Sequence, residues 1–263
     1  MTRPATPAEA ALDELAATGA LLVALDFDGT LAPLENDPME ARMLPAAREA
    51  VEALTAVPGT VVALVSGRSL SDLRIIAEHD DDSRIWLAGS HGAEFWVPGE
   101  GAVEPEDPGE DVALRDRLRT EAENATSDLA GVWIEPKTFG FGVHTRRADA
   151  EAADRAHRSA DRIVEAEAPH WRRRTGHNIV EYSFRHEGKD SAVATLRERT
   201  HATAVLFAGD DVTDEDALRS LNPGDVGVHV GPGPTAARVL VDDIPAMAGF
   251  LAELARRRAA ARR

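Results

Sequence analysis

Two aspartates separated by one residue, Asp26 and Asp28, are the side chains of this sequence best suited to chemistry. They follow the apolar run Leu21–Leu25 and precede Gly29, which lets a chain turn sharply. On an extended backbone both carboxylates point to one side, about 6.6 to 7 Å apart. Like charges at that spacing favour a bound divalent cation, a perturbed pKa or both. An Asp-x-Asp-Gly turn that only closes a strand is the plainer interpretation. An EF-hand fits less well, because its loop continues with further acids between two helices.

Three other segments place polar residues beside predicted strands or helices: Ser66-Gly67, Lys189, and Asp210-Asp211 with Asp214. The carboxyl ends of strands in an open α/β sheet face the crevice where ligands bind. Carboxylate oxygens favour Mg²⁺, and a hydroxyl with backbone amides at a helix start suits a phosphate. Lys189 would neutralise the charge on phosphoryl oxygens. Together these segments predict a site for phosphoryl transfer.

The elements that must position these residues alternate in type. Apolar runs predict buried strands, and amphipathic stretches between them predict helices. The strand candidates are residues 21–25, 60–65, 85–88, 202–208 and 226–230, and the helix candidates are 45–57, 69–77, 189–199 and 244–258. A capping box at Thr6-Pro7-Ala8-Glu9 opens a further helix. This order predicts an α/β fold with a Rossmann-like parallel sheet and right-handed crossovers.

A second pattern interrupts the first after a polar, Pro- and Gly-rich link at residues 98–109. A helix at 110–130 precedes two strand candidates, and a helix at 148–166 precedes two more, so an αββ unit occurs twice. We expect helices packed on an antiparallel sheet. The predicted domains are a core of residues 1–107 and 186–263 and an inserted α+β (αββαββ) domain of residues 108–185.

Composition limits the possible partners. The formal net charge is −17, so nucleic acid and anionic membranes are not expected to bind. Residues 108–185 hold 13 Lys and Arg against 14 Asp and Glu, which leaves the inserted domain far less repulsive to an anion. There is no Cys, which excludes thiolate chemistry. No apolar run is long enough for a membrane helix, and we expect a soluble, cytoplasmic monomer.

The segments around Asp26, Ser66, Lys189 and Asp210 resemble, in their order and residue patterns, the motifs of the haloacid dehalogenase superfamily of phosphotransferases. The resemblance implies that Asp26 is a nucleophile that forms an aspartyl-phosphate and that Asp28 is the general acid and base. It further implies Mg²⁺ held by Asp26, the carbonyl of Asp28 and Asp210. Asp211 or Asp214 would lie just behind these ligands, and Thr30, Ser66, Gly67 and Lys189 would contact the phosphate.

A narrower resemblance is to the trehalose-6-phosphate phosphatase family. It is carried by Ser66-Gly67-Arg68, Gly89-Ser90-His91-Gly92, Lys137 with His144-Thr145-Arg146, the segment Gly209–Asp216, and Gly231–Ala237. The inserted unit is similar to that family's cap domain. By this resemblance Arg68 on the core, with Lys137, Arg146, His177 and Glu181 on the cap, would hold trehalose 6-phosphate while the cap excludes water.

The cap motif departs from the family pattern at two positions, where His177 replaces a lysine and Ser183 an arginine. A residue that is often tyrosine is Thr145 here. Alternatives therefore stay open. The substrate could be another sugar phosphate, such as sucrose phosphate or mannosyl-phosphoglycerate. The protein could also be a phosphomutase, or a non-catalytic sugar-phosphate sensor, although a sensor is expected to lose Asp26 or Asp28.

Overall fold

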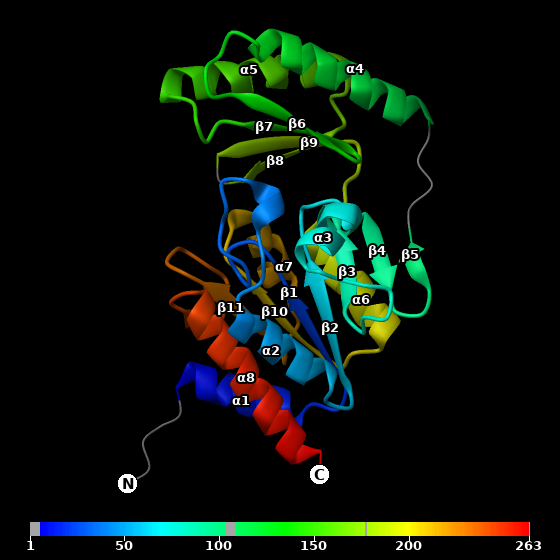
Figure 1. The fold of residues 1–263 in the computed structure, drawn as a ribbon, viewed down its shortest axis with the longest axis vertical. Helices are drawn as coiled ribbons and strands as arrows, with labels where there is room; N and C mark the ends of the chain where they lie inside the picture. Colours follow the sequence, from blue (N-terminus) through cyan, green and yellow to red (C-terminus); the bar gives the residue numbers. More distant parts are fainter. Residues whose placement is uncertain (1–5, 104–108, 177, 263) are drawn as a thin grey trace. The chain divides into compact units, whose positions relative to one another are not determined.

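The computed structural model describes residues 6–103, 109–176 and 178–262 of the 263-residue chain. The chain divides into two compact units, which are described separately. One unit comprises Met1–Glu104 with Glu187–Arg263, and the other comprises Pro105–His186. Figure 1 shows the ribbon coloured along the sequence.

An eight-stranded sheet forms the centre of the first unit. Its order is β12-β11-β10-β1-β2-β3-β4-β5, and the first six of these strands run parallel while β4 and β5 are antiparallel to their neighbours. In that order the strands span Val239–Val241, Val226–Val230, Ala204–Gly209, Leu21–Leu25, Thr60–Val65, Trp86–Gly89, Glu94–Val97 and Gly101–Val103. The predicted parallel sheet is confirmed, with β1 at its middle.

Helices cover both faces of this sheet. The helices are α1 (Pro7–Ala17), α2 (Pro45–Thr55), α3 (Leu70–Ile76), α6 (Lys189–Thr200), α7 (Glu215–Ser220) and α8 (Ile244–Ala261), with 3₁₀ turns at Pro38–Glu40, Ser90–Gly92 and Val212–Asp214. Leu21, Val23 and Leu25 of β1 join the hydrophobic core made with α1, α2, α3 and α8. Leu22 and Ala24 join a second core made with α6 and α7. Because β1 is buried on both faces, its side chains are all apolar.

The C-terminal helix is anchored by Arg258, although a frayed basic tail is the expectation from the sequence for residues 256–263. Arg258 is fully buried and donates hydrogen bonds to the Thr60 hydroxyl and to the carbonyls of Leu15, Thr18 and Gly59. A guanidinium has five donors, so this one side chain can satisfy the carbonyls at the end of α1 and the carbonyl just before β2. That prediction of fraying is wrong for the described part of the helix.

The second unit is a four-stranded antiparallel sheet with two helices. Its strand order is β6-β7-β9-β8, and α4 and α5 lie side by side on one face of the sheet (Figure 1). The elements are α4 (Gly109–Thr126), β6 (Trp133–Lys137), β7 (Gly140–His144), α5 (Ala150–Glu167), β8 (Arg172–Gly176) and β9 (Ile179–Ser183). The predicted αββαββ pattern is confirmed.

Four short elements are absent from the sequence expectation: β4, β5, β12 and α7. The segment that reads as a polar link contains β5 and the turn that joins it to β4, with Gly99 at φ +83° in the turn and Gly101 at φ +86° as the first residue of β5. The other two are β12 and α7, with three and six residues, too few to show a period. Among the described helices, none combines the length and apolar character that crossing a bilayer needs.

Candidate active site

Lys189 joins the tip of β1 to the loop after β10. Its Nζ donates to Asp26 Oδ1 at 2.5 Å and to Asp214 Oδ1 at 2.6 Å. Lys189 and Asp26 are each 4% exposed, and Asp214 is fully buried. Lys189 is the first residue of α6, which packs on the sheet behind β1 and β2. The fold therefore brings together residues that lie far apart in the sequence.

Thr30 connects the two strand tips from the other side. Its hydroxyl lies 3.1 Å from Asp26 Oδ2 and 3.3 Å from Asp210 Oδ1. The strand register explains the meeting, because Leu25 pairs with Ala208 in parallel β1 and β10. Asp26 and Asp210 therefore follow neighbouring strands at almost the same height.

Two glycines allow this close approach. A Cβ on Gly29, which has φ +82°, would lie 2.1 Å from Asp210 Oδ2, and a Cβ on Gly209 would lie 2.2 Å from Asp214 Cγ. Asp214 also accepts hydrogen bonds from the amides of Asp210 and Asp211 through Oδ2. It therefore fixes the loop that carries Asp210 while its other oxygen holds Lys189.

Negative charge exceeds positive charge at this point. Burial raises the pKa of Asp26 well above its usual value, Lys189 opposes the rise, and Asp214 and Asp210 add to it. Burial and then Asp214 raise the pKa of Asp210 to about 7. The pKa of Lys189 is raised because Asp214 and Asp26 outweigh the effect of its burial, which lowers it. Lys189 is therefore a permanent cation that does not fully compensate the acids.

These acids fit a divalent cation. Asp26, Asp210 and Asp214 can each offer a carboxylate oxygen, and the three oxygens lie within 4.8 Å of one another. Hard oxygen donors in partly buried positions suit Mg²⁺, and a dication would relieve the repulsion that raises the pKa values. The expected ligands Asp26 and Asp210 belong to this group. Asp214 is the third member of this group, whereas Asp211 donates its backbone amide to Asp214.

Asp28 faces a different partner. Arg68 donates Nε to Asp28 Oδ2 and Nη2 to Asp28 Oδ1, both at 2.6 Å. The two carboxylates at the end of β1 are thus held separately, Asp26 by Lys189 and Thr30, and Asp28 by Arg68. Sequence reasoning assigns Arg68 to the substrate and does not anticipate this pair.

The loop after β2 carries Ser66 and Gly67. Ser66 is buried, and its Oγ accepts the amide of Arg68 at 3.2 Å. The parallel register pairs Leu25 with Leu64, so this loop leaves the sheet beside the Asp26 loop. A Cβ on Gly67 would lie 2.7 Å from the ring of His91, which accounts for glycine at that position.

Predicted cap residues meet on one face of the β6-β7-β9-β8 sheet. Lys137 Nζ lies 3.0 Å from Glu135 Oε2 and 3.2 Å from Glu181 Oε1, and His144 Nε2 lies 2.6 Å from the same oxygen of Glu135. Burial lowers the pKa of Lys137, but Glu181 and Glu135 outweigh it and raise the pKa. Arg146 is exposed in the turn after β7, and His177 lies outside the described residues.

Sequence reasoning missed Glu135 and Trp133 on this face. Trp133, Glu135 and Lys137 alternate along β6, and alternate strand residues share a face, so their spacing is a signal that could have found them. Trp133 is 37% exposed, and its ring stacks on His144 with centroids 4.4 Å apart and planes 3° apart. An aromatic ring, two carboxylates and an ammonium group therefore lie together on this face, the mixture of apolar and polar groups that small-molecule sites use.

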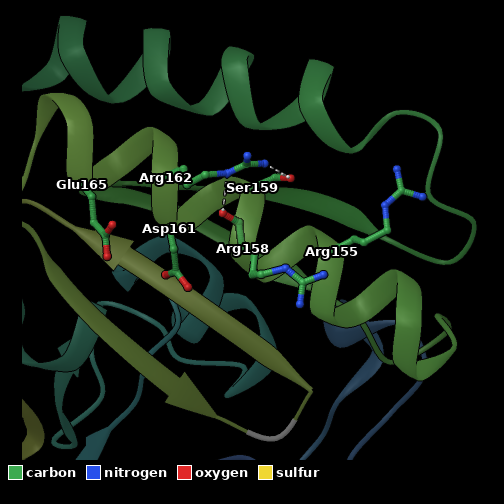
Figure 2. A pocket seen from close by; sticks show the side chains of 6 residues that line it. All are labelled: Arg155, Arg158, Ser159, Asp161, Arg162 and Glu165. Atoms are coloured by element: carbon green, nitrogen blue, oxygen red, sulfur yellow. Dashed lines mark hydrogen bonds between the residues drawn. The ribbon is translucent and has the colours of Figure 1, made fainter.

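A surface hollow of about 450 Å³ lies along α5 in the second unit. Figure 2 shows its lining residues, Arg155, Arg158, Ser159, Asp161, Arg162 and Glu165. Arg155 and Arg158 form ion pairs with nearby acids, which is typical of a solvated helix surface. None of the predicted site residues lines this hollow.

Comparisons with known proteins agree with the motifs. Residues 24–239 match the family model described as trehalose-phosphatase. A trehalose-phosphate phosphatase from Mycobacterium bovis (strain BCG / Pasteur 1173P2) is 31% identical over 246 residues, which cover 89% of this chain and 61% of that protein. The chain thus spans about three-fifths of the length of that curated relative.

Solved structures show the same fold. The C-terminal domain of Candida albicans trehalose-6-phosphate phosphatase matches with a TM-score of 0.82 at 20% identity, covering 97% of this chain and 98% of that chain. A haloacid dehalogenase-like hydrolase from B. subtilis matches with a TM-score of 0.58 at 16% identity, covering 88% and 98%. The expected haloacid dehalogenase core with an inserted cap is therefore confirmed at the level of fold.

Proposed function

The chain belongs to the trehalose-phosphatase family, and from this premise we propose that it hydrolyses trehalose 6-phosphate to trehalose and inorganic phosphate. The observation that carries the proposal is Lys189 bridging Asp26 and Asp214, 2.5 Å and 2.6 Å away, at the tip of β1. A buried ammonium group beside a buried carboxylate suits the charge that develops on a transferring phosphoryl group.

In the first step, a carboxylate oxygen of Asp26 attacks phosphorus, and the bond from phosphorus to the sugar oxygen breaks. The departing oxygen takes a proton from Asp28. The product on the protein is an aspartyl-phosphate, which divides one difficult displacement into two easier ones. Lys189 holds Asp26 in place and offsets the charge of the phosphoryl oxygens.

In the second step, a water molecule gives its proton to Asp28 while its oxygen attacks phosphorus. The bond from phosphorus to Asp26 breaks, and inorganic phosphate leaves. Arg68 orients Asp28 through hydrogen bonds to both of its carboxylate oxygens. One of these oxygens must therefore leave Arg68 when it gives a proton to the sugar oxygen or takes a proton from water. Thr30 and the Ser66–Gly67 loop are the proposed phosphate contacts.

Mg²⁺ is the proposed cofactor, held by the carboxylates of Asp26 and Asp210 and the backbone carbonyl of Asp28, with Asp214 behind them. When bound it supplies positive charge for phosphate oxygens. We place the sugar contacts on Lys137, Glu181 and Arg146, with His177 as a further candidate. The cytoplasmic location and monomeric state expected from the sequence stay predictions.

A panel of substrates tests the proposal. Phosphate release is measured with Mg²⁺ from trehalose 6-phosphate, glucose 6-phosphate and sucrose 6-phosphate, with kcat/KM compared across the three. We expect trehalose 6-phosphate to be preferred by at least about tenfold, over glucose 6-phosphate because a second sugar ring adds contacts that raise kcat/KM, and over sucrose 6-phosphate because its fructose ring differs in shape from the second glucose. Equal rates on all three would contradict the trehalose assignment. Isomerised sugar phosphate without free phosphate would indicate a mutase.

A further inference from the structure

The turn between β3 and β4, which contains Ser90 and His91, and Glu94 at the start of β4 have no role in the chemistry described above. We propose that this turn is a clamp that positions the Ser66–Arg68 loop for phosphoryl transfer, with Glu94 as its positioning residue. The proposal deepens the proposed function and rests on it, since the loop carries the proposed phosphate contacts.

Backbone hydrogen bonds tie the clamp to the loop at both ends. The amide of Ser90 donates to the carbonyl of Arg68 at 2.6 Å, and the amide of His91 donates to the carbonyl of Ser66 at 2.9 Å. Gly89 allows the turn to lie close to the start of α3, because a Cβ there would lie 2.6 Å from the Leu70 amide nitrogen. The height of the Ser66–Arg68 loop above the sheet is therefore set by a neighbouring turn.

Glu94 locks this arrangement through its carboxylate. Glu94 is only 6% exposed, and its Oε2 accepts the Leu70 amide at 3.1 Å and the Ser90 hydroxyl at 2.5 Å. Removing such an acceptor leaves a buried amide unsatisfied. The Glu94 carboxylate therefore connects the turn, through Ser90, with the start of α3, through Leu70, just after the Ser66–Arg68 loop.

The clamp has a strained backbone. Ser90 and His91 have φ values of +48° and +58°, a region that residues other than glycine rarely occupy. Such conformations persist where the surroundings over-determine them, and they cluster at functional sites. The next residue, Gly92, lies against Ala192 of α6, where a Cβ would be 2.6 Å from the Ala192 Cβ. The same turn therefore touches both the phosphate loop and the helix that begins with Lys189.

Arg68 transmits the position of the loop to the chemistry. Its side chain holds Asp28 with two hydrogen bonds, and its carbonyl is held by the clamp. A shift of the loop would displace Ser66 and Asp28 together. Misplacement of a reacting group by about 1 Å can cost about a hundredfold in rate, so a buried acid outside the reaction can control kcat.

The test compares Glu94→Ala with Asp225→Ala. Asp225 is also a buried carboxylate of the first unit that accepts backbone amides, those of Val205 and Asn222, but it serves the opposite end of β10. The free energy of unfolding and the kcat for p-nitrophenyl phosphate with Mg²⁺ are measured for both variants. We expect both variants to lose stability, Asp225→Ala the more because Arg197 also loses its ion pair. We expect kcat to fall at least about tenfold for Glu94→Ala and to change within about twofold for Asp225→Ala.

Glu94→Gln provides the rescue. Its amide oxygen can still accept the Leu70 amide, so we expect it to restore most of the lost kcat. A second pair of variants tests the clamp if Glu94→Ala does not fold.

Ser90→Gly relieves the positive φ and removes the hydroxyl, and the control His201→Gly relieves a φ of +52° at the end of α6. We expect only Ser90→Gly to lower kcat. Equal kcat in Glu94→Ala and Asp225→Ala, or in Ser90→Gly and His201→Gly, would overturn the clamp.

Hydrogen exchange separates failure of the clamp from failure of the proposed function. If the unaltered protein releases no phosphate from any ester, the proposed function fails, and the clamp is then judged by the amides of residues 67–70. We expect these amides to exchange at least about tenfold faster in Glu94→Ala than in Asp225→Ala, and faster in Ser90→Gly than in His201→Gly, because local opening controls exchange. Unchanged exchange in this segment would overturn the clamp on its own.

Discussion

Arg68 holds Asp28 through two parallel hydrogen bonds of 2.6 Å, from Nε to Oδ2 and from Nη2 to Oδ1. Only a planar guanidinium makes this pairing, because the ammonium group of lysine is a point charge. Arg68 therefore orients Asp28 within the protein, in addition to any contact that it makes with the substrate.

We expect Arg68→Lys to lower kcat/KM for trehalose 6-phosphate by about 10- to 100-fold, because Asp28 loses its fixed orientation. Steady-state kinetics measure this. Arg238→Lys is the control, since Arg238 forms an exposed ion pair with Glu14, and its kcat/KM should stay within about twofold of the unaltered protein, as is usual for surface pairs. Full activity in Arg68→Lys would show that the paired hydrogen bonds are dispensable.

Asp26→Asn and Lys189→Met should both abolish phosphate release, but only Lys189→Met should lower the free energy of unfolding. Asp26→Asn removes one of several crowded acids, so the free energy of unfolding should stay equal or rise. Lys189→Met leaves Asp26 and Asp214 buried without their cation, which should cost about 3 to 5 kcal/mol. Urea unfolding and phosphate assays measure the two effects. Turnover by a folded Asp26→Asn variant would exclude Asp26 as nucleophile.

Mg²⁺ should raise the melting temperature of the protein, because a ligand that binds only the folded state adds about 2.7 kcal/mol at a hundred times its Kd. Asp210→Asn should remove most of this rise. Asp216→Asn should keep it, since Asp216 lies on α7 outside the group of three acids. Differential scanning calorimetry with Mg²⁺ and with EDTA gives the comparison. A rise that survives in Asp210→Asn would place the ion elsewhere.

Alkaline titration can report on the second unit, because Tyr182 is the chain's single tyrosine. Burial, together with its hydrogen bond to Asp161, raises the pKa of Tyr182. A raised pKa in the folded state means that this contribution to stability is complete below about pH 10, the unfolded value, and is lost as pH rises above it.

Tyrosinate absorbance should therefore appear only at pH values well above 10, together with loss of circular dichroism. Asp161→Asn removes the negative charge and should move the absorbance change to lower pH. Exposed Asp128→Asn, on the same unit, should leave it in place. Ionisation near pH 10 in the unaltered, folded protein would contradict the burial of this phenol.

Local patterns were sufficient for much of the fold and of the site. The apolar runs of β1, β2 and β10 end in polar residues, and the parallel register places those ends together. The partners of each charge were not predictable, because Arg68 with Asp28 and Asp214 with Lys189 depend on tertiary positions that no periodicity encodes. The β4–β5 hairpin was missed because its turn glycines resemble a linker.

The cap face shows the same limit. Lys137 and Glu181 follow from the motif, and they contact one another. The alternation of Trp133 and Glu135 with Lys137 along the predicted strand is a separate signal that the motif does not include. His177 lies outside the described residues, so its role stays a prediction.

The 163 positions that separate Asp26 from Lys189 also matter during protein synthesis. A ribosome adds Asp26 to the chain long before it adds Lys189, so a growing chain carries the acidic end of β1 without its counter-charge. Translation must therefore pass the whole inserted unit before Lys189 can reach Asp26.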